Sequence, residues 1–130
     1  MMKDWLRKHP DVRTIRVAAA DLNGQARGKR VPTRFAENVV KNGTRFPFSV
    51  LNLDIWGEDI DDSPLVFEQG DQDGVLKPTE RGFMPMPWLE APTALLPIWM
   101  FRENGTPYEG DPRHALNTIV QRFKARGLTP

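Results

Sequence analysis

The sequence predicts an α+β fold, and three neighbouring patterns carry that prediction. Side chains over Thr14–Ala19 alternate with a period of two, which is typical of a half-buried strand. Asn23-Gly24 supplies the positive φ angles of a tight hairpin turn, and Gln25–Val31 forms the return strand. Apolar residues then fall at helical spacing over Phe35–Val40. A hairpin followed by a helix that crosses back over the sheet is the start of a β-grasp.

Apolar patterns at both ends of the chain predict two further helices. Lys3–Lys8 is expected to form a short helix with Trp5 as its largest apolar residue, and His9-Pro10 ends it because the residue before proline avoids the α region. Asp111-Pro112 is typical of a helix start, with an N-cap followed by proline in the first turn. The C-terminal helix that follows has one apolar stripe, made of Leu116, Ile119, Val120 and Phe123.

The middle of the chain predicts shorter elements. Thr33 is expected to cap the helix that follows the hairpin. Phe46–Leu53 is typical of another strand, and two more are expected near Gly82–Met86 and Thr93–Phe101. Pro97 has no backbone N–H, which indicates an edge position or a bulge in the last of these strands.

Composition excludes several classes of site. The 130 residues contain no cysteine, so disulfides, thiolate nucleophiles and cysteine-based metal sites are excluded. His9 and His114 lie too far apart in the sequence for a local metal-binding motif. The apolar runs are too short to span a bilayer, and the N-terminus lacks the apolar region of a signal peptide. We therefore expect a cytoplasmic protein with no membrane partner.

Charge is divided unevenly along the chain. Residues 1–50 carry 11 Lys and Arg against 4 Asp and Glu, a net charge of +7. Residues 51–110 carry 3 against 12, a net charge of −9, and residues 111–130 carry 4 against 1. A chain divided in this way is suited to a charged partner surface.

The segment from Asp54 to Asp73 holds eight acidic residues and no Lys or Arg. It lacks a continuous apolar face, so we expect a long mobile loop, with order resuming at Gly74–Pro78. Its carboxylates allow three interpretations: a site for a hard cation, a solvated loop, or a surface that attracts a cationic ligand or the basic surface of a partner. Their spacing is not that of an EF-hand. The carboxylates concerned are Asp59, Asp61, Asp62, Asp71 and Asp73.

The remaining polar residues form no complete catalytic set. A basic patch on the return strand has no interleaved aromatic residues, so a solvated or interface-facing strand is favoured over nucleic acid binding. The patch has one glycine and is not a phosphate-binding loop. Ser49 and Ser63 have no histidine nearby in the sequence, and His114 is expected to be exposed. The patch consists of Arg27, Lys29, Arg30 and Arg34.

The order and spacing of several short segments strongly resemble the N-terminal domain of the glutamine synthetase family, and most of all its bacterial γ-glutamyl-amine ligases, such as γ-glutamylpolyamine synthetases. The resemblance covers nearly the whole chain. It rests on Val12–Ala20, Asp21-Leu22-Asn23-Gly24, Arg27–Pro32, Gly70–Gly74, Pro87-Trp88, Asp111-Pro112-Arg113 and Gly127-Leu128.

This resemblance implies a β-grasp domain that completes the active site of a neighbouring subunit in a ring, stacked into a dodecamer. The family phosphorylates the γ-carboxylate of glutamate with ATP, and an amine then displaces the phosphate. ATP and Mg²⁺ or Mn²⁺ bind to a larger C-terminal domain, which would begin after Pro130. The resemblance therefore implies no catalytic, nucleotide-binding or metal-binding residue in these 130 residues, and no ligase activity for them alone.

The resemblance also implies a candidate amine site. In true glutamine synthetases an aspartate in a Phe-Asp-Gly-Ser-Ser stretch helps to bind ammonium, and here Pro47 stands at that position. A proline cannot hold ammonium, which favours a larger amine. The residues then expected beside the amine pocket of the adjacent subunit are Ser49, Asp54 and Trp56.

These observations divide the chain into a helical segment over residues 1–11, a β-grasp domain over residues 12–110 with an acidic loop at 54–73, and a helix over residues 111–130 that leads to the catalytic domain. Two alternatives remain open. Asp54 could replace the missing aspartate in an ammonia-using glutamine synthetase, or the chain could be a stand-alone β-grasp interaction module without catalysis.

Overall fold

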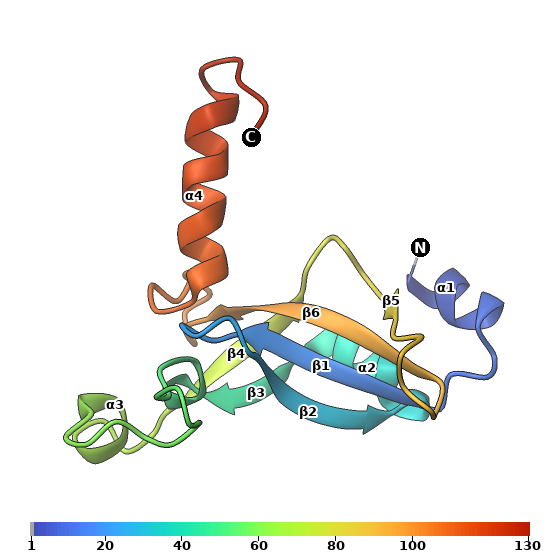
Figure 1. Cartoon of the computed structure of the whole chain (residues 1–130), viewed down its shortest axis with the longest axis horizontal. Coiled ribbons are helices and arrows are strands. Elements are labelled where there is room, and N and C mark those ends of the chain that lie inside the picture. Colours follow the sequence, from blue (N-terminus) through green and yellow to red (C-terminus); the bar gives the residue numbers. More distant parts are fainter. Residues whose placement is uncertain (1) are drawn as a thin grey trace.

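The structure is a computed structural model that describes residues 2–130, and it places helices around one mixed sheet (Figure 1). The α-helices are α1 (Met2–Lys8), α2 (Ala36–Asn42), α3 (Pro64–Phe67) and α4 (Pro112–Lys124). The strands are β1 (Thr14–Ala20), β2 (Ala26–Pro32), β3 (Thr44–Pro47), β4 (Asp73–Pro78), β5 (Met84–Pro85) and β6 (Thr93–Phe101). Two 3₁₀ turns, η1 (Thr33–Phe35) and η2 (Phe48–Leu51), follow β2 and β3.

The sheet has six strands in the order β2-β1-β6-β4-β3, and β5 pairs with β6 off this path. β1 and β6 are parallel, whereas every other pairing is antiparallel. α2 crosses one face of the sheet between the hairpin and β3 (Figure 1). The predicted α+β class and β-grasp are confirmed.

The core lies between the sheet and the segments that cover it. β6 is buried along most of its length and contributes Leu96, Ile98 and Met100. α2 turns Ala36 and Val39 toward this core, while its other side chains remain at the surface or half-buried. Burying an aliphatic side chain of this kind stabilises the folded state by about 1.5 to 3 kcal/mol. A helix of seven residues is not stable by itself, so α2 is held mainly by its packing against the sheet.

Pro97 lies inside a continuous central strand, so the expected edge position or bulge was wrong. One side of β6 pairs with β1 as far as Pro97. The other side pairs with β5 at Ala94 and Leu95 and with β4 from Ile98 onward. Pro97 falls between these two partners, where the ladder is already interrupted and a missing N–H costs little.

A buried carboxylate organises the β1–β2 turn. Asp21 is 2% exposed, and its Oδ1 accepts hydrogen bonds from the backbone N–H groups of Asn23 (2.9 Å) and Gln25 (2.8 Å). Its Oδ2 accepts from Arg27 Nε at 2.8 Å. Burial raises the pKa of Asp21, but the Arg27 hydrogen bond and the two backbone donors outweigh it, so the pKa lies below its ordinary value.

The turn differs from the tight hairpin turn in which Asn23 and Gly24 were both expected to have positive φ angles. Gly24 has a φ of +75°, but Asn23 is not among the positive-φ residues of the described chain, and Asp21 N donates to Gln25 O to close a longer turn. In the return strand, a Cβ on Gly28 would lie 1.8 Å from Val17 O. Only glycine therefore permits this approach of β2 to β1.

Three other sequence expectations were wrong. The strand expected over Phe46–Leu53 ends at Pro47, and Phe48–Leu51 forms a 3₁₀ turn, after which Asn52 N donates to Ser49 O at 2.8 Å. Thr33 lies in η1 and donates its hydroxyl to Val12 O, so it does not cap α2. His114 is not exposed, since its side chain is 14% accessible.

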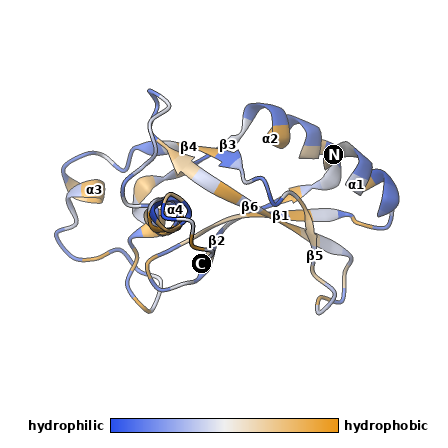
Figure 2. Ribbon diagram, turned by 90° about the horizontal axis from the view of Figure 1, so that it is seen from above, coloured by the Kyte–Doolittle hydropathy of each residue, from blue (hydrophilic) through white to orange (hydrophobic). Residues whose placement is uncertain are grey.

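α4 is attached to the sheet at its base and projects away from it (Figure 1). Asp111 caps the helix as predicted, accepting from Arg113 N at Oδ1, and its Oδ2 accepts from Met100 N in β6 at 2.9 Å. His114 Nε2 lies 2.8 Å from Met100 O, and its ring stacks on Trp99. Figure 2 looks along α4 and shows hydrophobic and hydrophilic colours on it. The predicted stripe is exposed at Leu116, Ile119 and Phe123.

Val39→Asp is expected to lower the free energy of unfolding by about 3 kcal/mol or more, because it places an unpaired charge in the core beneath α2. Val39 is buried, whereas Asn38 on the same helix is exposed. Asn38→Asp is therefore the matched control, with an expected change within about 0.5 kcal/mol. Chemical denaturation measures both variants, and equal midpoints would show that Val39 is not part of the core.

Asp21→Asn is expected to lower the free energy of unfolding at neutral pH by about 2 to 3 kcal/mol. Because the folded-state pKa of Asp21 is depressed, its charge stabilises the fold above the unfolded-state pKa, and this contribution is lost as pH falls through the folded-state pKa. The difference in the free energy of unfolding between Asp21→Asn and the unmodified chain should therefore become smaller as the pH is lowered. Urea denaturation at a series of pH values tests this, with the exposed Asp11 replaced by Asn as control. A difference that is constant with pH would contradict it.

Candidate functional site

The candidate site lies at the start of the acidic segment, where Asp54 builds a tight turn. Asp54 Oδ1 accepts hydrogen bonds from the backbone N–H groups of Trp56 (2.8 Å) and Glu58 (2.9 Å). The backbone of Asp54 also accepts from Gly57 N and donates to Glu58 O. Within residues 2–130, Asp54 Oδ2 makes no hydrogen bond, so one carboxylate oxygen is available to a cation from outside the chain.

The turn presents apolar side chains to the surface. Trp56 is 85% exposed, and Ile55 beside it is 75% exposed. Large apolar side chains at this level of exposure, grouped on one turn, are typical of a surface that meets a partner or ligand. In Figure 1 the segment that carries this turn extends beyond the ends of β3 and β4, away from α1 and α2.

The hairpin turn fixes the position of this segment. Asn23 Nδ2 donates to Leu53 O at 2.9 Å and to Asp54 O at 3.2 Å. Leu22 N donates to Leu51 O at 3.2 Å. The residues that Asp21 orders therefore hold the base of the candidate site, a role for Asn23 that the sequence analysis missed because its partners are about thirty residues away.

Ser49 is placed differently from the other two predicted site residues. It is buried, and its hydroxyl donates to Asp71 Oδ1 at 2.5 Å. Asp71 is exposed and has a φ of +51°, a strained value for a residue other than glycine. The structure thus brings Asp54 and Trp56 together at the surface, while Ser49 holds the far end of the acidic loop against η2.

The acidic loop contains more structure than expected. α3 forms where Pro64 occupies the first turn after Ser63, a start signal that the sequence analysis overlooked. Leu53 and Asp59 form an isolated bridge, and Asp71 N donates to Leu65 O. Within residues 2–130, no group of three or more His, Asp or Glu side chains is placed to hold a metal ion.

No described helix combines the length and apolar character that crossing a bilayer requires. Arg27 of the basic patch is committed to Asp21, and Lys29 donates to Arg45 O. The patch thus serves partly to hold β2 against its neighbours.

Comparison with known proteins identifies relatives of the chain. Gamma-glutamylputrescine synthetase PuuA from Escherichia coli K12 is 32% identical over 129 residues, which are 99% of this chain and 27% of that protein. A glutamine synthetase from Staphylococcus epidermidis is 29% identical, over 98% of this chain and 27% of its own length. The homologues of the chain described here are thus members of the glutamine synthetase family.

The glutamine synthetase homologues are much longer than this chain, which spans about a quarter of their length. A solved structure described as a GmaS/ADP complex matches 97% of this chain and 26% of its own, with a TM-score of 0.69 and 22% identity. This likeness shows a shared fold. No protein-family profile matches the chain.

Residues 54–73 are expected to exchange their amide protons quickly in the 130-residue chain, because most of their side chains are exposed and their carboxylates repel one another. Hydrogen exchange followed by mass spectrometry or NMR measures this, with β6 as the slow-exchanging internal reference. The amides of this segment that donate hydrogen bonds, such as those of Trp56, Glu58 and Asp71, should exchange more slowly than the rest of it but faster than β6. Protection across the whole segment equal to that of β6 would contradict the predicted mobility.

Proposed function

We propose that this chain is the N-terminal domain of an ATP-dependent ligase that joins the γ-carboxyl group of glutamate to an amine. The observation that carries the proposal is the 32% identity to gamma-glutamylputrescine synthetase over 99% of this chain. The relatives are about four times longer, so the catalytic machinery is assigned to the rest of the protein. The proposal includes assembly into a ring of subunits in the cytoplasm.

The exposed apolar stripe on α4 supports the assignment of this chain to a larger protein. Leu116 is 64% exposed, and Ile119 and Phe123 lie on the same helix without cover from the described chain. Contact with the following domain would remove these side chains from water.

ATP and a divalent cation do not fit the residues of this chain. Within residues 2–130 there is no acidic or histidine cluster for a metal, and the glycines form no phosphate-binding loop. We therefore assign both groups to the part of the protein beyond this domain and route no chemistry through them here.

Asp54 and Trp56 are proposed to face the amine pocket of a neighbouring subunit. The free Oδ2 of Asp54 can pair with a protonated amine, while Oδ1 keeps the turn in shape. The exposed Trp56 ring can cover the alkyl part of the amine or make a cation–π contact with its ammonium group. Ser49 is proposed to act indirectly, by holding the far end of the acidic loop through its bond to Asp71.

The acidic loop would raise the local concentration of a cationic amine. Eight carboxylates between Asp54 and Asp73, with no Lys or Arg among them, give this surface a strong negative potential. Such attraction is screened by salt over about 8 to 10 Å at physiological ionic strength. The effect favours amines with more than one positive charge over ammonium.

A second candidate is glutamine synthesis from ammonia, which the relative from Staphylococcus epidermidis favours. Pro47 argues against it, because it stands where a glutamine synthetase is expected to have its ammonium-binding aspartate, and a proline side chain has no group to bind ammonium. The two candidates differ in which amine the enzyme uses most efficiently.

Steady-state kinetics of the full-length protein test the proposal. Asp54→Asn should raise KM for a diamine about tenfold, because it removes a charge-assisted hydrogen bond while the amide oxygen still accepts from Trp56 N and Glu58 N. KM for ATP and for glutamate should remain unchanged. Asp61→Asn, an exposed carboxylate on the same loop, is the matched control.

Other outcomes of this experiment count against the proposal. Similar increases in all three KM values for Asp54→Asn would indicate defective assembly and remove Asp54 from the amine site. A kcat/KM for ammonium above that for every diamine tested would favour the glutamine synthetase candidate.

A further inference from the structure

A groove of about 370 Å³ lies on the sheet where β1, β2 and β6 run side by side. Small residues line it on β1 and β2, among them Ala18 and its register partner Gly28. Met86 and Trp88, from the segment between β5 and β6, line it as well. Because the strands contribute small side chains where the loop contributes large ones, room for a ligand remains between them.

Two arginines of this groove have no counter-charge. Arg16 on β1 and Arg30 on β2 lie directly opposite each other, and both line the groove. Within residues 2–130 neither side chain makes an ion pair, whereas Arg27, Arg45 and Arg102 each pair with a carboxylate. Like charges directly opposite each other on a sheet are destabilising. An anion bound between the two guanidinium groups would remove that repulsion.

The two guanidinium groups also select the kind of anion. The Cβ atoms of directly opposite residues are about 5 Å apart, so Arg16 and Arg30 can both reach one small group. Guanidinium is planar, donates only, and matches phosphate oxygens in pairs. A phosphomonoester carries about two negative charges at neutral pH and three acceptor oxygens, which match two arginines. A carboxylate has only one charge and two oxygens.

Trp88 indicates what else the ligand carries. Its side chain is 70% exposed, and in the described part of the chain its ring contacts no other ring and no cation. Trp5 and Trp99, in contrast, stack on His9 and His114. A free tryptophan face beside a groove is a surface on which a flat ring can stack.

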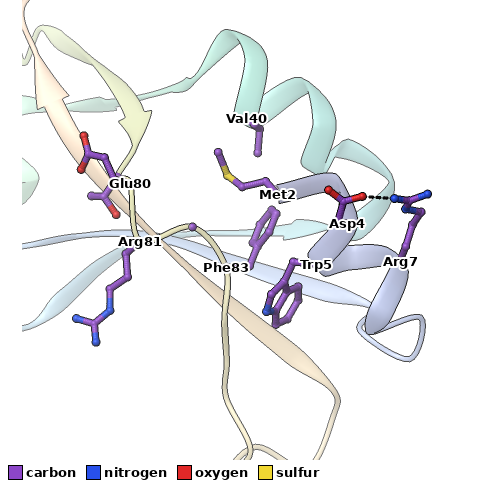
Figure 3. Close-up of a pocket in the computed structure, with 10 residues that line it drawn as sticks. Met2, Asp4, Trp5, Arg7, Val40, Glu80, Arg81 and Phe83 are labelled. Carbon is purple, nitrogen blue, oxygen red and sulfur yellow. Dashed lines mark hydrogen bonds and ion pairs between the residues drawn. The ribbon is translucent and has the colours of Figure 1, made fainter.

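A larger pocket between α1, α2 and the segment that joins β4 to β5 is a weaker candidate (Figure 3). Its Trp5 ring already stacks on His9 and lies beside Phe83. Asp4 and Arg7, which also line it, pair with each other. These groups are engaged within the chain, whereas the arginines and the tryptophan of the groove on β1 and β2 are available to a ligand.

We propose that the groove binds an aromatic phosphomonoester, with its phosphate between Arg16 and Arg30 and its ring on Trp88. Among the described residues that line the groove there is no hydroxyl, imidazole or carboxylate, so the ligand is bound and not transformed. A nucleoside triphosphate carries more charge than two arginines balance, which separates this site from an ATP site. The groove shares no residue with the amine surface at Asp54 and Trp56, and the inference does not rest on the proposed function.

An NMR titration of the 130-residue chain at neutral pH tests the inference with three probes. 1-Naphthyl phosphate has both the ring and the doubly charged group. 1-Naphthyl sulfate has the same shape with one charge fewer, and inorganic phosphate has no ring. 1-Naphthyl phosphate should produce saturable shifts at the amides of Ala18 and Gly28 and at the indole N–H of Trp88. The other two probes should each bind about tenfold more weakly.

Two variants assign the contacts, and both replace exposed residues so that the core is left intact. Arg30→Gln should weaken binding of 1-naphthyl phosphate about tenfold. Trp88→Leu should reduce that affinity to the value for inorganic phosphate. Arg122→Gln on α4 removes an exposed arginine that does not line the groove, and as the matched control it should change no affinity.

Three results would each overturn the inference. The first is equal affinity for all three probes, and the second is a shift that does not saturate. The third is an equal loss of affinity in Arg30→Gln and Arg122→Gln, which would show that only the net charge of the chain attracts the phosphate.

Discussion

The burial of β6 is the constraint on which the rest of the fold depends. One edge of this strand pairs with β1 in parallel, and the other is shared by β5 and β4. A strand that is paired on both edges and covered on its faces must satisfy its backbone groups completely. The elements that β6 contacts therefore have few alternative arrangements, and α1, α2 and α4 are all positioned around it.

The second organising interaction is the buried Asp21 carboxylate. It orders the hairpin turn, and that turn in turn holds Leu53 and Asp54 through the side chain of Asn23. The position of the candidate amine-binding surface thus depends on a residue that does not touch it. Replacing Asp21 would therefore displace the candidate amine-binding surface by disordering the turn, in addition to lowering the stability of the whole fold.

Local patterns predicted the elements whose cause is local. β1, α2 and α4 follow from periodicity, and the start of α4 also follows from the Asp111 cap. The uninterrupted path of β6 through Pro97 could not be predicted, because it depends on where two distant strands meet β6. Asp54 and Trp56 came from the family resemblance, whereas the hydrogen bond of Ser49 joins it to Asp71, 22 positions away, which no local pattern could predict.

The attachment of α4 has a mechanical consequence. Among the described residues, the helix is hydrogen-bonded to β6 only near its first turn, through Asp111 and His114. Its thirteen residues extend for about 20 Å at 1.5 Å per residue. Because the helix is attached at one end, it can tilt as a rigid rod about that end. A tilt of about 5° at the base displaces its far end by about 2 Å. Small shifts in the sheet are amplified at the tip of α4, and a force applied to that tip is transmitted to the central strand.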